Sequence, residues 1–189
     1  MFKAIVIGTS AGGLEVLKEL LSIIKHPFPL PIIIIQHLSP NHESYLPKIL
    51  SHTGHKVLEV DEKISIEKEK VYIAPPNYHV LVEKDYTFSL TVEARESYAR
   101  PSIDVTFETA SDAYKSSLIG ILLTGANHDG AQGLKRILDN EGYTIVQDPK
   151  TAYADEMPVS AIKLIQPNEI LSIKDIGHFL NDLLNKELK

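Results

Sequence analysis

A serine, a histidine and an aspartate follow separate apolar segments of this 189-residue chain, and they are the residue types of a serine hydrolase. Ser10 stands in Gly8-Thr-Ser-Ala-Gly12, the Gly-x-Ser-x-Gly spacing of a nucleophile elbow, in which small neighbours allow a sharp turn that exposes the serine hydroxyl. A serine hydroxyl is a weak nucleophile, so it needs a general base, and the base needs a carboxylate that orients it. His37, which follows the isoleucine run 32–35, is the expected base, and Asp129 is the expected carboxylate.

Each of these residues also has an alternative role. A glycine-rich turn after a first strand often binds a nucleotide phosphate, but the dinucleotide pattern requires a glycine where Ser10 stands. It also requires an acidic residue where the second apolar segment ends in Gln36-His37. His37 is alternatively a structural histidine at a strand end, and Asp129 alternatively caps the helix that follows it.

Further polar residues compete for the same roles. His128 is a rival base for Ser10, although a surface position in a loop is the commoner place for such a residue, as it is for His42. Asp148 follows another apolar segment, at residues 143–147, and is the alternative third member beside His37.

No cofactor or metal ion is expected. The chain has no Cys, which excludes disulfides, a thiolate nucleophile and Cys-ligated zinc or iron–sulfur clusters. His52-x-x-His55 has a spacing seen in metal sites, but no third ligand is evident, and a solvated helix end is the expected role. No Gly-Lys-Ser/Thr follows the glycine-rich turn, which excludes a P-loop. Arg100 either contacts an acidic substrate or forms a surface ion pair.

Charge and hydropathy restrict the partners. Lys and Arg number 19 and Asp and Glu 25, a net charge of −6, and no run of Lys or Arg forms the basic surface that nucleic acid requires. The longest apolar run, residues 32–35, is far shorter than the roughly 20 residues of a membrane span. We therefore expect a soluble, cytoplasmic protein that neither binds nucleic acid nor enters the membrane; the oligomeric state is left open.

The elements that must position these residues are short apolar segments alternating with amphipathic helices. This alternation predicts an α/β fold with a doubly wound, mostly parallel, Rossmann-like sheet in one domain over residues 1–189. Three segments in the middle of the chain, 71–74, 79–82 and 86–93, are expected to form an antiparallel or mixed extension of the sheet, as an antiparallel strand or hairpin insertion. In such sheets ligands bind beyond the carboxyl ends of the strands, where Ser10, His37 and Asp129 are all expected. The helix after Ser10 would point its N-terminus, with the Ala11 N–H, at an oxyanion.

A series of segments resembles, in order, the motifs of the catalytic domain of the chemotaxis protein-glutamate methylesterase (CheB) family. The segments are Ile7-Gly-Thr-Ser-Ala-Gly-Gly13, Gln36-His37, Arg100-Pro-Ser-Ile-Asp-Val105, Leu122-Leu-Thr-Gly125 with Asp129-Gly-Ala131, and Gln147-Asp-Pro149 followed by Met157-Pro158. The resemblance implies hydrolysis of glutamate γ-methyl esters on methyl-accepting chemotaxis receptors, with release of methanol, and deamidation of receptor glutamines. The family's catalytic Ser, His and Asp fall on Ser10, His37 and Asp129, and its fold is a doubly wound parallel sheet with an antiparallel strand.

The chain departs from the family's pattern in a few places. Ala11 stands where the family commonly has Thr, and Ala126 and Asn127 stand where it usually has Met and Gly. Family members usually carry a receiver domain ahead of the catalytic domain, whereas here the first predicted strand begins about two residues after Met1. A catalytic domain without a receiver is expected, either as a natural standalone protein or as a fragment of a longer chain. A non-catalytic receptor-binding module of the same fold is the alternative function, and a nucleotide-binding oxidoreductase is a more distant one.

Overall fold

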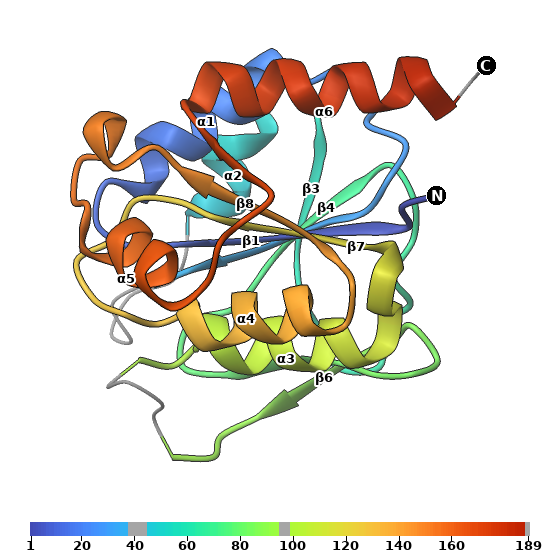
Figure 1. The fold of residues 1–189 in the computed structure, drawn as a ribbon. Coiled ribbons are helices and arrows are strands. Elements are labelled where there is room, and N and C mark those ends of the chain that lie inside the picture. Colours follow the sequence, from blue (N-terminus) through green and yellow to red (C-terminus); the bar gives the residue numbers. More distant parts are fainter. Residues whose placement is uncertain (38–44, 95–98, 188–189) are drawn as a thin grey trace.

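A seven-stranded parallel sheet forms the centre of the computed structural model, which describes residues 1–37, 45–94 and 99–187 (Figure 1). From one edge to the other the strands are β3 (Lys56–Glu59), β4 (Lys70–Ile73), β2 (Ile32–Gln36), β1 (Ala4–Thr9), β7 (Leu118–Leu122), β8 (Tyr143–Gln147) and β9 (Glu169–Leu171). Every neighbouring pair is parallel. The predicted doubly wound α/β fold is confirmed, and the carboxyl ends of its strands share one edge.

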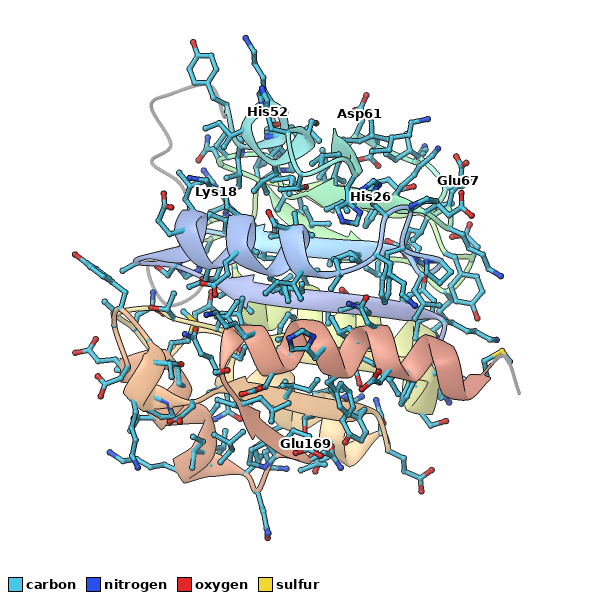
Figure 2. The ribbon with its side chains drawn as sticks, turned by 90° about the horizontal axis from the view of Figure 1, so that it is seen from above. Lys18, His26, His52, Asp61, Glu67 and Glu169 are labelled. Atoms are coloured by element: carbon cyan, nitrogen blue, oxygen red, sulfur yellow. The ribbon has the colours of Figure 1, made fainter. Side chains whose placement is uncertain are left out.

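Helices cover both faces of the sheet. One face carries α1 (Gly13–Ile23), α2 (Leu46–Ser51) and α6 (Ile173–Glu187); the other carries α3 (Ile103–Tyr114), α4 (Ala131–Asp139) and α5 (Glu156–Leu164). Short 3₁₀ turns span Lys115–Ser117 and Pro149–Thr151. Figure 2 shows α1 and α6 side by side over the first face, with Asp61 and Glu169 toward opposite edges of the sheet. No helix of the described residues is both long enough and apolar enough to cross a lipid bilayer.

The central strands are apolar on both faces because they separate two cores. Side chains alternate along a strand, so in β2 Ile33 and Ile35 join the core under α3 and α4, whereas Ile32 and Ile34 join the core under α1 and α6. All four are completely buried, and burial of a side chain of this size stabilises the fold by about 1.5–3 kcal/mol. The ends of β1 and β2, and with them the backbone of Ser10 and His37, are therefore firmly held.

The middle of the chain differs from the expectation. Its first segment, β4, is a parallel strand of the main sheet, while β5 (His79–Val82) and β6 (Phe88–Thr91) form a separate antiparallel pair. The predicted hairpin insertion is confirmed, but the prediction that these two strands extend the main sheet is wrong. Side chains of α3 bond the β5 backbone instead: the Thr106 hydroxyl donates to the Val80 carbonyl at 2.8 Å, and the Val82 N–H donates to Thr109 Oγ1 at 3.1 Å. The hairpin therefore packs under α3 (Figure 1).

Candidate functional site

Ser10, His37 and Asp129 meet at the carboxyl ends of three neighbouring strands. Ser10 follows β1, His37 follows β2, and Asp129 lies in the loop between β7 and α4. Ser10 Oγ is 3.2 Å from His37 Nδ1, and His37 Nε2 is 2.8 Å from Asp129 Oδ2. The His37 side chain is 13% exposed and that of Asp129 is completely buried, so the imidazole lies between a half-buried serine and a buried carboxylate.

The turn that carries Ser10 is held by Thr124, in the loop that follows β7. The Ser10 N–H donates to the Thr124 carbonyl at 2.9 Å, and the Thr124 hydroxyl donates to the Ala11 carbonyl at 2.9 Å. Gly12 has a φ of 78°, a left-handed conformation that costs glycine little, and α1 begins at the next residue. The N–H groups of Ala11 and Gly12 have no hydrogen-bond partner within the described ranges 1–37, 45–94 and 99–187. Two backbone donors thus directly follow Ser10 in the chain, at the positive end of a helix.

Gln36 joins the two catalytic candidates through their backbones. Its Nε2 donates to the Ser10 carbonyl at 2.9 Å and to the His37 carbonyl at 3.0 Å. The Gln36 Oε1 atom is buried without a hydrogen-bond partner in the described part of the chain. It lies directly against Gly13, because a Cβ added to that glycine would be 1.8 Å from Oε1. From the sequence, Gln36 only marks the end of a strand; the signal for a further role is an amide side chain directly after an apolar run that is buried on both faces.

The Asp129 carboxylate lies at the N-terminus of α3. It accepts hydrogen bonds from the Ser102 hydroxyl at 3.0 Å, from the Ile103 N–H at 2.7 Å and from the Asp104 N–H at 3.0 Å. The following helix, α4, has Gly130 as its N-cap, and the Gly133 N–H in its first turn donates to the Asp104 carboxyl rather than to Asp129. The alternative that Asp129 caps the helix after it is therefore wrong, because its carboxylate caps a different helix, α3.

Burial alone would raise the pKa of Asp129, but the hydrogen bonds from His37 and from the Asp104 and Ile103 N–H groups outweigh it and hold that pKa below its ordinary value. Asp129 is thus a carboxylate over the whole neutral range. The pKa of the neighbouring Asp104 is raised to about 7, chiefly by burial. The hydrogen bond from the Gly133 N–H lowers this pKa, and the charge of Asp129 raises it further. The two carboxyl groups hence differ in protonation although their residues are hydrogen-bonded neighbours.

The rival residues lie apart from this chain of hydrogen bonds. His128 is exposed, and no hydrogen bond of its side chain is found among the described residues. Asp148 Oδ1 accepts from the Lys150 N–H at 3.0 Å, in the 3₁₀ turn after β8. Among the rival carboxylates the structure therefore brings Asp129, and not Asp148, to His37. His42 lies outside the described residues.

The remaining polar candidates have structural partners. The His52 imidazole bonds backbone carbonyls of its own helix, and His55 is buried with its Nε2 3.0 Å from the Leu21 carbonyl. No group of three or more His, Cys, Asp or Glu side chains suited to a metal ion occurs in the part of the chain that the structure describes. Arg100 donates to Asn77 Oδ1 and to the Val92 and Glu93 carbonyls, so its guanidinium ties the chain to the end of β6.

A fourth side chain reaches the imidazole. Asn127 Nδ2 is 3.2 Å from His37 Nδ1, the same ring nitrogen that faces Ser10. In the sequence Asn127 stands out only as a departure from a family pattern, because a contact across 90 residues of chain leaves no local signal.

Comparison with known proteins assigns the chain to a family. Residues 5–180 match the CheB methylesterase family. The chain belongs to the CheB methylesterase family. Its fold superimposes with a TM-score of 0.92 on the crystal structure of the Thermotoga maritima CheB methylesterase catalytic domain, at 29% sequence identity and covering 97% of this chain and 99% of that one.

Relatives in the CheB family differ in length. A protein of Leptospira interrogans named putative protein-glutamate methylesterase/protein-glutamine glutaminase is 48% identical over 177 residues, which cover 93% of this chain and 92% of that protein. A protein-glutamate methylesterase/protein-glutamine glutaminase of Methanospirillum hungatei is 36% identical over 182 residues, which cover 96% of this chain but 52% of that protein. The resemblance to the CheB catalytic domain predicted from the motifs is confirmed.

Proposed function

We propose that this protein is a serine hydrolase that removes the γ-methyl ester from glutamate side chains of methyl-accepting chemotaxis receptors and deamidates receptor glutamines at the same site. The observation that carries the proposal is the hydrogen-bonded series Ser10 Oγ, His37 Nδ1, His37 Nε2 and Asp129 Oδ2, with separations of 3.2 and 2.8 Å, in a CheB-family fold. The names of the Leptospira and Methanospirillum relatives support the substrate class.

The proposed reaction is acyl transfer in two steps. His37 Nδ1 takes the proton of the Ser10 hydroxyl as Oγ attacks the ester carbonyl carbon, and Asp129 stabilises the imidazolium that forms. The Nδ1 proton then passes to the methoxy oxygen, the carbon–oxygen bond breaks, and methanol leaves an acyl-enzyme on Ser10. Water, deprotonated by the same nitrogen, hydrolyses this ester and restores the serine. With a glutamine side chain the first leaving group is ammonia, and the remaining steps are identical.

The oxyanion of each tetrahedral intermediate would be held by the backbone. The N–H groups of Ala11 and Gly12, at the start of α1, lack partners within the described residues and follow the nucleophile directly. Because these donors belong to the main chain, Ala at position 11 supplies the same N–H as the Thr commonly found there. The departure at this position is therefore compatible with catalysis.

The test is methanol release from a methylated receptor fragment by the wild-type chain and by variants of the series. We expect Ser10→Ala to abolish release, and Asp129→Asn to lower kcat by up to about 10⁴-fold, because an amide at that position no longer favours the required tautomer of the imidazole. His128→Ala is the matched control: it removes the rival base from the same loop and should leave kcat near the wild-type value. Thermal denaturation of each variant establishes that it folds.

The outcomes separate the candidate functions. Release by the wild-type chain and its loss in folded Ser10→Ala would support the hydrolase. Receptor binding without methanol or ammonia release, and with a Ser10 that a serine-reactive phosphonate does not label, would favour the binding module. Loss of activity in His128→Ala, with Ser10→Ala still active, would reject the assignment of roles.

A further inference from the structure

The Asn127 side chain lies on the ring nitrogen of His37 that faces Ser10. Its Nδ2 and the Ser10 Oγ are each 3.2 Å from His37 Nδ1. At its other end, Asn127 Oδ1 accepts the Asp129 N–H at 3.1 Å. Because a backbone N–H is always a donor, this bond fixes the amide with its oxygen toward Asp129 and its NH₂ group toward the imidazole. One short loop thus holds both sides of the ring, Asp129 at Nε2 and Asn127 at Nδ1.

These contacts select a single tautomer of the imidazole. A carboxylate only accepts hydrogen bonds, so the 2.8 Å contact with Asp129 places the ring proton on Nε2 and the lone pair on Nδ1. That lone pair then faces two donors, the Ser10 hydroxyl and the Asn127 amide. The arrangement suits the neutral ring. In the imidazolium, Nδ1 carries a proton that points at the Asn127 NH₂ group, and two donors face each other.

We propose that Asn127 is a positioning residue that acts through His37: its amide donates to Nδ1, which favours the neutral ring with the Nδ1 lone pair directed toward Ser10 over the imidazolium. The catalytic part of this inference rests on the proposed hydrolase function, whereas the effect on the ring does not. After Ser10 has given up its proton, the same contact favours onward transfer of that proton from Nδ1 to the leaving group.

Other polar and charged groups act on the ring from the surrounding elements. The Asp129 carboxylate, in contact with Nε2, favours the imidazolium and opposes Asn127. Asp104, at the start of α3, has a weaker effect on the ring because its hydrogen bonds go elsewhere: its N–H donates to Asp129, and its carboxyl accepts from the Gly133 N–H. Ser10, from the β1 side, is neutral, and His79, from β5, accepts the Ser102 N–H behind Asp129. Asp129 is the charged group that touches the imidazole in the described part of the chain.

A direct readout of the ring tests the inference without requiring activity. In a Ser10→Ala background, nitrogen-15 NMR of the His37 imidazole reports its tautomer and the pH at which it is half protonated. Asn127→Ala removes the donor, and we expect this pH to rise by about 0.5–1 unit. Asn127→Asp places an acceptor on Nδ1 and should raise it further. The Nε2–H tautomer should predominate in the parent protein.

Kinetics supply the second readout. With Ser10 present, Asn127→Ala should shift the acidic limb of the kcat/KM profile for methanol release to higher pH by the same amount, while KM on the plateau stays near the wild-type value. His128→Ala, in the same loop but without a bond to the ring, is the matched control and should shift neither profile. Asn127 is only half-buried, so thermal denaturation should show folded variants.

The outcomes keep the two proposals apart. Equal half-protonation pH values in the parent, Asn127→Ala and Asn127→Asp would overturn the role of Asn127 whether or not the protein is an esterase. A shifted NMR titration in a protein that releases neither methanol nor ammonia would uphold the contact and reject the hydrolase. Methanol release with an unmoved acidic limb in Asn127→Ala would uphold the hydrolase and reject the positioning role.

Discussion

Two carboxyl groups at the start of α3, those of Asp129 and Asp104, have pKa values that are shifted in opposite directions. Asp129 accepts donors from the first turn of the helix and from His37, and these lower its pKa despite its burial. Asp104 lies in that same first turn, and burial, followed by the nearby Asp129 charge, raises its pKa to about 7. Residues that share a helix terminus can thus have different charges, because Asp129 takes up the free N–H donors that would otherwise favour a second carboxylate.

The raised pKa of Asp104 predicts a pH dependence of stability. Between about pH 4 and pH 7 the folded protein holds a proton on Asp104 that the unfolded chain has released, so the free energy of unfolding falls as pH rises, by up to about 1.4 kcal/mol per pH unit. The lowered pKa of Asp129 acts in the opposite sense, but only below about pH 4. Asp104→Asn stays neutral and keeps an oxygen for the Gly133 N–H, so we expect it to be more stable than wild type at pH 8 and similar at pH 5.

Urea denaturation at pH 5 and pH 8, followed by far-ultraviolet circular dichroism, measures this difference. Asp182→Asn is the matched control, because Asp182 is exposed on α6 and its substitution removes the same single negative charge at pH 8. A wild-type stability that stays level or rises from pH 5 to pH 8, with Asp104→Asn following the same course, would contradict the prediction.

Single residues also mark what the sequence alone makes predictable. Ser10, His37 and Asp129 follow apolar segments, so the rule that ligands bind beyond strand ends suffices to group them. Gln36, Asn127 and the N–H groups of α3 act through contacts between distant segments, and nothing in the local sequence indicates which groups those contacts join. Spacing accordingly finds residues with reactive groups more readily than residues that orient them.

At the scale of elements, the junction of β1, α1 and β2 is closely packed around Gln36. A Cβ at Gly13 would lie 1.8 Å from Gln36 Oε1 and 2.8 Å from Thr9 Oγ1, so α1 approaches the strands closely only because residue 13 has no side chain. Gln36 in turn holds the backbone carbonyls of Ser10 and His37. The position of the helix and the position of the site are therefore coupled through one amide.

We expect Gly13→Ala to displace the Gln36 side chain, to lower stability by about 1–3 kcal/mol through overpacking, and to lower kcat/KM for methanol release. In a Gln36→Ala background the contacts with the Gln36 amide are gone and the 2.8 Å approach to Thr9 Oγ1 remains, so the same substitution should cost less. A double-mutant cycle on the free energy of unfolding, with Gly13→Ala, Gln36→Ala and the double variant, measures this coupling. An equal cost of Gly13→Ala in both backgrounds would show that Gln36 is not the obstacle.

Elements at the margins were harder to predict than those at the centre. The central strands are continuous apolar runs and were expected from the sequence, whereas β9 is three residues long, with Ile170 exposed, and has no such signature. The sequence predicts β5 and β6 as strands but places them in the wrong sheet, because the periodicity of a segment indicates a strand without indicating its partner. Hydrogen bonds from Thr106 and to Thr109 of α3 decide where this hairpin lies.

For the whole molecule, one sheet separates two apolar cores, and the site lies at the edge that both cores support. Ile33 and Ile34 are adjacent in β2 but belong to different cores, so each tests one side of the sheet. The strands that divide the cores also carry Ser10 and His37 at their ends. If residues 1–189 form a single domain, both faces of the sheet unfold together. A loss of packing on either face should then destabilise the strand ends that carry the site.

Ile33→Val and Ile34→Val test that requirement. Each removes one buried methyl group and should cost about 0.5–1.5 kcal/mol. Some amides in α1, on one face, and in α4, on the other, exchange only by global unfolding. If both cores form one cooperative unit, either variant lowers the free energy of exchange protection of these amides in both helices, by the amount that it takes from the free energy of unfolding. Native-state hydrogen exchange with mass spectrometry resolves the two helices. Weakened protection of α4 alone in Ile33→Val, and of α1 alone in Ile34→Val, would instead mean that the two faces unfold independently, because a local loss of packing would then stay on the face that it affects.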